Sequence, residues 1–171
     1  TELGMGGGGF ATHFENVELR KRGTEQVEFL LSANVGEQPK PLRMVASGGE
    51  ISRVMLAIKS VLAQADQVPT LVFDEIDAGV GGATANKVAA KLAELAETHQ
   101  VLCITHLPAI AAAGKTHILV TKNEEGNRAL TRIVTLQKEE RVKEIARLLD
   151  GTVSGVSLEH AKKLLRDSVR K

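Results

Sequence analysis

Two adjacent carboxylates, Asp74 and Glu75, are the side chains of this sequence best suited to chemistry. They follow a short apolar run, residues 70–73, whose composition predicts a strand buried on both faces of a parallel sheet. Ligands of open α/β sheets bind at such strand ends. One carboxylate there can bind Mg²⁺ through its water shell, while its neighbour orients or deprotonates an attacking water. A strand that ends in a solvated acidic turn is the alternative interpretation.

A second feature, Ser47-Gly48-Gly49-Glu50, precedes a run of apolar residues at helical spacing. The run predicts an amphipathic helix that ends near Gln64. Ser47 stands at the N-cap position with Glu50 three residues later, which is the capping-box pattern. The glycines permit close approach of a ligand, and the free N–H groups of a helix N-terminus bind anions. A capped helix without any ligand explains this segment equally well.

A histidine, His106, follows the next predicted strand, residues 101–104. We expect this strand to lie beside the strand at 70–73, which would bring His106 to the sheet edge that carries the two carboxylates. An imidazole there can hydrogen-bond a γ-phosphate. A lone histidine after a strand is more often structural, but its combination with the other two features favours the phosphate role.

The sequence patterns around these residues predict an α/β fold, in which a parallel sheet core is flanked by helices and has antiparallel edge strands. Asp77 opens a glycine-rich loop after the carboxylates. The other predicted elements are an antiparallel hairpin within residues 10–35, helices at about 83–98, 109–113, 138–149 and 157–170, and a hairpin of strands 118–121 and 130–136.

The composition is that of an ordinary globular protein: 171 residues, 43% hydrophobic and 25% charged. The formal net charge of +1 argues neither for nor against nucleic acid. The single cysteine, Cys103, excludes an intramolecular disulfide and fits a reducing, cytoplasmic location; its apolar neighbours predict an inert buried residue. No stretch approaches the ~20 apolar residues of a membrane span, so no membrane contact is expected.

The glycine run at residues 6–9 predicts a flexible segment, and a natural turn and a linker are both open interpretations. Gly4 and Gly9 have the spacing of a P-loop, but Phe10-Ala11 stands where that motif requires Lys-Ser/Thr. Without the lysine the main phosphate contact is missing, so we reject a P-loop here.

In combination, these features resemble the motifs of ABC-type ATPase heads. Residues 47–50 are similar to the signature motif, residues 71–75 to Walker B, Asp77 to the D-loop and residues 104–106 to the switch histidine. Arg53 is typical of the SMC, Rad50 and RecF branch rather than of transporters. The longer sequences of residues 45–53, 73–82 and 105–108 resemble those of a bacterial family of DNA double-strand break repair and recombination proteins within that branch. The resemblance covers about residues 25–165; its motifs are specific together and weak singly.

The resemblance implies the C-terminal lobe of a split head that binds ATP and Mg²⁺. It implies that Asp74 supports the metal, that Glu75 polarises the attacking water and that His106 contacts the γ-phosphate. It also implies that Ser47, Gly48, Gly49 and Glu50 complete the ATP site of a second head in an ATP-dependent dimer, and that Asp77 lies in the loop that links the heads.

The resemblance further implies that the N-terminal head lobe of the same protein is a partner. That lobe would carry the Walker A lysine. The lysine, the Q-loop and a long coiled coil would all precede Thr1. We therefore expect ATP hydrolysis only in combination with that lobe, and none from this chain alone. Residues 1–36 would form N-terminal strands and a glycine-rich segment, and residues 37–171 the ATPase lobe. The competing functions are a non-enzymatic interaction lobe and a transporter nucleotide-binding subunit.

DNA is a further expected partner through the full-length protein, and a nucleoid association would follow. The last predicted helix is rich in basic side chains: Lys162, Lys163, Arg166, Arg170 and Lys171. A solvated helix face explains them at least as well as DNA contact does. With four Phe and no Tyr or Trp, an aromatic base-stacking platform is not expected.

Overall fold

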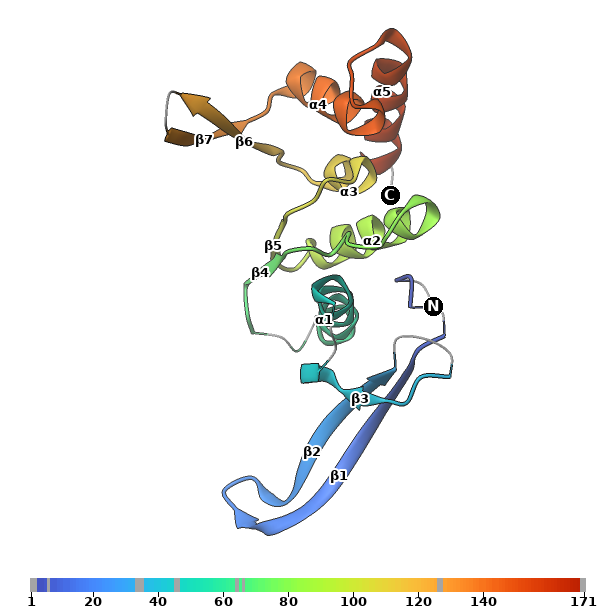
Figure 1. Cartoon of the computed structure of the whole chain (residues 1–171), viewed down its shortest axis with the longest axis vertical. Coiled ribbons are helices and arrows are strands. Elements are labelled where there is room, and N and C mark those ends of the chain that lie inside the picture. Colours follow the sequence, from blue (N-terminus) through green and yellow to red (C-terminus); the bar gives the residue numbers. More distant parts are fainter. Residues whose placement is uncertain are drawn as a thin grey trace. The chain divides into compact units, whose positions relative to one another are not determined.

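The computed structural model describes residues 3–5, 7–32, 36–44, 47–63, 65, 67–125 and 128–169 (Figure 1). The chain forms two compact units, Thr1–Ile104 and Thr105–Lys171. The predicted fold class is confirmed, because parallel strands, flanking helices and antiparallel strands are all present. The expected division of the chain at residue 36 stays a prediction.

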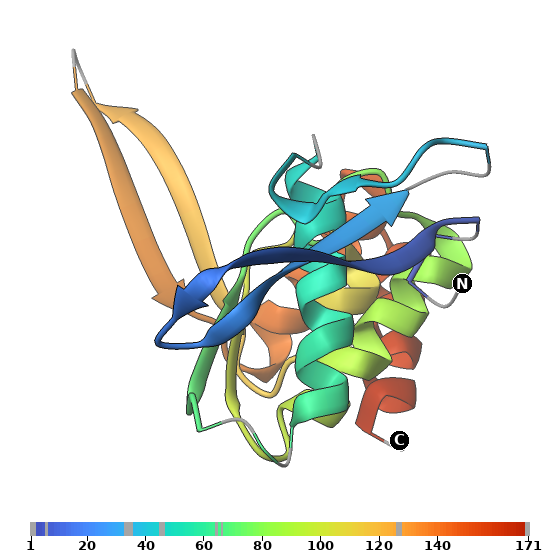
Figure 2. The ribbon, with the colours of Figure 1, turned by 90° about the horizontal axis from the view of Figure 1, so that it is seen from below.

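The first unit contains the predicted parallel strand pair. Strand β4 (Thr70–Phe73) pairs in parallel with β5 (Gln100–Cys103), so the two predicted strands are neighbours. Helix α2 (Gly82–Leu95) makes the crossover between them, as a parallel pair requires. Helix α1 (Gly48–Leu62) lies beside α2 in both views (Figures 1 and 2). Buried apolar side chains come from three of these elements: Leu71 and Phe73 of β4, Val54 and Leu56 of α1, and Val88, Ala89 and Leu92 of α2.

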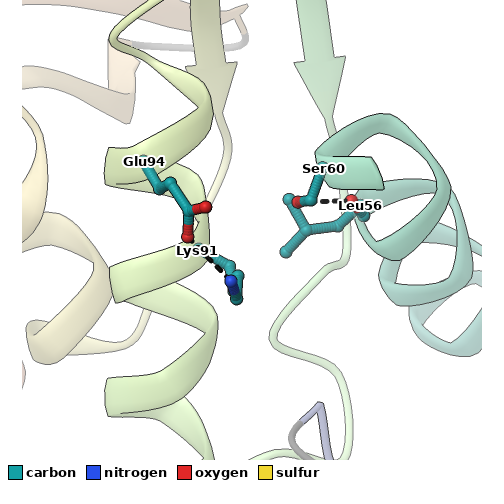
Figure 3. A network of polar contacts seen from close by, with 4 residues as sticks. All are labelled: Leu56, Ser60, Lys91 and Glu94. Carbon is teal, nitrogen blue, oxygen red and sulfur yellow. Dashed lines mark hydrogen bonds and ion pairs between the residues drawn. The ribbon is translucent and has the colours of Figure 1, made fainter. Parts of the chain in front are cut away.

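Helices α1 and α2 each carry a short-range polar contact within the helix (Figure 3). On α2, Lys91 Nζ lies 2.7 Å from Glu94 Oε2, and on α1, Ser60 Oγ donates to the Leu56 carbonyl at 2.8 Å. An exposed pair of this spacing stabilises a helix by about 0.2–0.5 kcal/mol. Burial of the apolar helix faces therefore contributes most of the stability of this layer.

The first unit also contains a long antiparallel hairpin, as predicted. Strand β1 (Gly9–Arg20) pairs with β2 (Gly23–Ser32), and the short β3 (Lys40–Pro41) adds to β2 (Figure 1). The 3₁₀ helix η1 (Leu42–Met44) follows. Pairs of residues opposite each other share one face of the hairpin. One face is apolar yet exposed, with the side chains of Phe10, Phe14, Val27 and Phe29.

The second unit consists of a small helical core and a two-stranded ribbon. Helices α3 (Pro108–Ala113), α4 (Lys138–Asp150) and α5 (Gly155–Val169) share a core of Ala112, Ile145, Ala146 and Ala161. Strands β6 (Ile118–Glu125) and β7 (Arg128–Thr135) form the predicted second hairpin, which is a sheet of its own (Figure 2).

The glycine run is only partly described. Gly6 lies outside the described residues, whereas the Gly7 and Gly8 amides both donate to the Met5 carbonyl, and Gly9 begins β1. Whether the run is a linker stays open. Among the described helices, none has the length and apolarity needed to cross a membrane.

Candidate functional site

The end of β4 carries the two predicted carboxylates. Asp74 and Glu75 are both exposed, and Asp74 Oδ1 accepts a hydrogen bond from the Glu75 amide at 2.9 Å. Glu75 has a φ of +55°, a left-handed conformation that no other non-glycine residue adopts in the part of the chain described. Such a conformation costs on the order of 1–3 kcal/mol and persists only where the surroundings enforce it. Enforced strain of this kind concentrates at functional sites.

The N-terminus of α1 lies directly against the loop that begins at Glu75. Ser47 is the N-cap, as predicted, and its Oγ accepts from the Glu50 amide at 3.4 Å. A Cβ added to Gly48 would collide with the Glu75 carboxylate. A Cβ added to Gly49 would lie 2.8 Å from Ala78 Cβ and 2.9 Å from the Glu75 carbonyl oxygen. Gly49 is therefore needed for this approach, whereas at Gly48 only the flexible Glu75 side chain stands in the way. Residues 45 and 46 of the predicted motif lie outside the described residues.

The second turn of α1 provides two further contacts that we did not predict. Ser52 Oγ donates to the Asp74 carbonyl at 2.6 Å. Arg53, only 6% exposed, donates from Nη1 to the Ile76 carbonyl at 3.3 Å and to the Ala78 carbonyl at 2.8 Å. Burial lowers the pKa of the Arg53 guanidinium, and the charge of Glu50 partly opposes that shift. The basic residue was visible in the sequence, but its burial was not.

The loop after β4 buries the next carboxylate. Asp77 is 4% exposed, and its carbonyl accepts from the Val80 amide at 3.1 Å. The thiol of Cys103 at the end of β5 is affected by both aspartates. Burial, then Asp77, then Asp74 raise the pKa of this thiol to about 12, which makes it a poor nucleophile.

His106 belongs to the second compact unit. It is exposed in a turn in which Thr105 Oγ1 accepts from the Leu107 amide at 3.0 Å, and α3 begins directly afterwards at Pro108. The first unit thus brings together the N-terminus of α1, the two carboxylates and Asp77. The contact of His106 with a phosphate stays a prediction.

A magnesium–nucleotide complex is compatible with this arrangement. Such a complex needs only one or two protein carboxylates because phosphates and waters fill the remaining metal positions. The exposed Asp74 and Glu75 carboxylates at a strand end meet that requirement. No cluster of three or more His, Cys, Asp or Glu is found within the described ranges, so a metal cage built from protein alone has no candidate there.

Comparisons with known proteins agree on one family. The chain is 52% identical over 149 residues to the DNA repair protein RecN of Treponema pallidum, covering 86% of this chain and 26% of that protein. It is 48% identical over 170 residues to RecN of Xylella fastidiosa, covering 97% of this chain and 30% of that protein. The chain therefore spans less than a third of the length of these relatives. No protein-family profile matches it.

Among solved structures, the chain is similar to the Smc head domain with a coiled coil and joint from Pyrococcus yayanosii. The TM-score is 0.61 at 25% identity, over 87% of this chain and 27% of that one. The resemblance to SMC-like heads that the motifs predicted is thus confirmed in both sequence and fold.

Proposed function

Starting from a chain that is RecN-like over most of its own length, we propose that it forms the part of an ATP-hydrolysing head that carries the signature helix, the Walker B carboxylates and the switch histidine. The head would act in DNA double-strand break repair and recombination in the cytoplasm. The observation that carries the proposal is the close approach of Gly48 and Gly49 to the loop that begins at Glu75. An anion-binding helix end and a candidate catalytic carboxylate thereby occupy one compact unit.

Each residue has a role that its position permits. When bound, Mg²⁺-ATP supplies the phosphoanhydride and the metal charge that offsets its oxygens. Asp74 holds the metal directly or through water, and Glu75 polarises the attacking water from the adjacent position. His106 contacts the γ-phosphate. Phosphoryl transfer depends mostly on positioning and on charge stabilisation, so these groups would act together with the Walker A lysine expected on the N-terminal lobe.

The helix end would serve a second head in an ATP-driven dimer. Ser47 offers a hydroxyl and Gly48 and Gly49 offer N–H groups to the phosphate bound there, and Glu50 belongs to the same turn. The Glu75 carboxylate now lies beside Gly48, and a carboxylate and a phosphate repel each other. We therefore infer that the Glu75 side chain rotates away when that phosphate arrives. Asp77 would act through the loop that it anchors, because its own side chain is buried.

The exposed apolar surfaces of the first unit indicate that a partner covers them in the complete head. Parallel sheets are normally covered on both faces. Yet Val72 and Leu102, which lie opposite each other on β4 and β5, are exposed. The apolar face of the β1–β2 hairpin is exposed as well. We assign the N-terminal lobe of the same head, which would carry Walker A, as the partner that covers these surfaces. A Val72→Lys variant should stay folded and lose association with that lobe in size-exclusion chromatography.

The decisive experiment measures ATP hydrolysis by this chain alone and after mixing with the N-terminal lobe of the same protein. Activity that appears only in the mixture and disappears with Glu75→Gln supports a split ATPase head. Activity of the chain alone would mean that it contains a phosphate-binding element of its own. If the two lobes associate without hydrolysis, the non-enzymatic interaction lobe is the better description.

The dimer and DNA parts of the proposal have separate tests. Ser47→Arg should abolish ATP-induced dimers of the intact protein and leave nucleotide affinity unchanged; dimers of wild-type strength would refute the trans role. In α5, Lys162 Nζ pairs with Glu159 Oε1 at 2.7 Å, and residues 170 and 171 lie outside the described part. DNA contact there requires a salt-sensitive affinity that falls when residues 162–171 are removed. A transporter subunit is not favoured, because the relatives reported above are DNA repair proteins.

A further inference from the structure

The side chain of Arg53 joins α1 to the loop at residues 74–80, and its role deepens the proposed function, on which it rests. We propose that Arg53 is a positioning residue: it makes the anion-binding end of α1 and the carboxylate of Glu75 move as one unit. Engagement of a second head at Ser47–Gly49 would then reach Glu75 through Arg53.

The contacts of α1 follow the loop backbone in a regular order. The carbonyl of residue 74 accepts from Ser52, and the carbonyls of residues 76 and 78 both accept from Arg53 Nη1. Alternate carbonyl groups of one loop are thus bound by two neighbouring side chains of one helix turn. Gly49 lies one turn earlier on the same helix face and contacts the same loop. A displacement of α1 therefore carries the loop with it.

The loop needs an external restraint because its backbone is strained. Glu75 has a φ of +55°, and the Ala78 amide closes a turn onto the Glu75 carbonyl at 2.9 Å. Arg53 donates to the carbonyls of Ile76 and Ala78, which come directly after Glu75 and at the end of the turn, so it opposes relaxation of this turn. The direction of the Glu75 side chain depends on that turn. Arg53 acts on the reaction through Glu75, without contacting substrate.

A buried arginine costs more desolvation free energy than a purely structural contact requires. A buried guanidinium loses hydration, and an apolar side chain of similar volume would fill the space at lower cost. What an apolar residue cannot do is hold two carbonyl groups at a fixed spacing. A cation with rigid donors can, and a lysine ammonium does so less well because its stem is flexible.

The test compares Arg53→Met and Arg53→Lys in the intact protein with a ligand-free readout on this chain. Without nucleotide, Arg53→Met should speed hydrogen exchange at the Ala78 and Val80 amides at least tenfold, because both amides bond within the loop. In the intact protein, the same change should lower kcat roughly 10- to 100-fold and leave KM within about twofold. Arg53→Lys should recover part of both effects.

A double-mutant cycle separates positioning from simple destabilisation. If Arg53 acts through Glu75, Arg53→Met should not lower the residual rate of Glu75→Gln any further. Arg141 supplies a matched control in the other unit, where its guanidinium donates to the carbonyls of Ala111, Ala112 and Gly114. Arg141→Met should reduce thermal stability and leave kcat and the exchange of the Ala78 and Val80 amides unchanged.

The outcomes distinguish this inference from the proposed function. If Glu75→Gln hydrolyses ATP like the wild type, the proposed function fails and the role of Arg53 fails with it. If Glu75→Gln is inactive while Arg53→Met keeps the wild-type kcat, only the positioning role is overturned. Unchanged amide exchange in Arg53→Met, or a further rate loss on top of Glu75→Gln, would overturn it as well.

Discussion

The two neighbouring glycines at the start of α1 should respond to alanine in opposite directions. Glycine within a helix is less favourable than alanine by up to about 1 kcal/mol, so propensity alone predicts that both substitutions stabilise the chain. Their surroundings differ. A Cβ at Gly48 meets the far end of the flexible Glu75 side chain, which can rotate away. A Cβ at Gly49 meets Ala78 Cβ at 2.8 Å, and the carbonyl oxygens of Glu75 and Ala78 at 2.9 and 3.0 Å.

These contacts set the expected magnitudes. Real Cβ atoms do not approach backbone this closely, so Gly49→Ala must push α1 away from the loop and strain the bond from Arg53 to Ala78. Overpacking of this kind costs about 1–3 kcal/mol, which exceeds the propensity gain. We expect a net loss of about 1–2 kcal/mol for Gly49→Ala and a gain of up to about 1 kcal/mol for Gly48→Ala.

The assay is thermal unfolding of this chain followed by circular dichroism. At about 2–4 °C per kcal/mol, Gly49→Ala should lower Tm by about 2–8 °C, and Gly48→Ala should leave Tm unchanged or raise it by up to about 4 °C. Gly155→Ala is the matched control, because Gly155 is also the first residue of a helix and has open space around its Cβ position. A Tm for Gly49→Ala at or above the wild-type value would refute the reasoning.

Three further predictions concern single side chains. Ser47→Ala should lower the free energy of unfolding in urea by about 0.5–1 kcal/mol through loss of the N-cap. This is the low part of the usual range because the bond to the Glu50 amide is long, 3.4 Å. An unchanged free energy of unfolding would show that the N-cap does not stabilise the chain. Ser157→Ala should cost about 1–3 kcal/mol, because this buried hydroxyl accepts from the Ser154 amide at 2.9 Å; a neutral result in the same assay would contradict that. Cys103, with its pKa raised to about 12, should resist iodoacetamide at pH 8 and react faster with each added pH unit. Asp74→Asn should speed this labelling. Complete labelling of the wild type within minutes at pH 8 would count against the raised pKa.

Local patterns in the sequence determined the elements and their order. The apolar run at residues 70–73 and the serine before the helical spacing predicted β4 and α1 within a few residues of their ends. The β1–β2 hairpin was predicted within residues 10–35, but without the bounds of its strands. The combination of Ser47–Glu50, Asp74–Glu75 and His106 was enough to identify the resemblance to SMC-like heads. These features are local because each depends on side chains only a few positions apart.

Only the tertiary structure decided how α1 meets the loop after β4. The sequence singled out Arg53 and Asp77 by their motif positions, but it did not show that both side chains are buried. The positive φ of Glu75 had no sequence signal, because glutamate does not favour the left-handed region. It arises from contacts between residues more than 20 positions apart, such as Ser52 with Asp74 and Arg53 with Ala78. Burial and strain of this kind depend on which distant segments pack together, and no short sequence pattern contains that information.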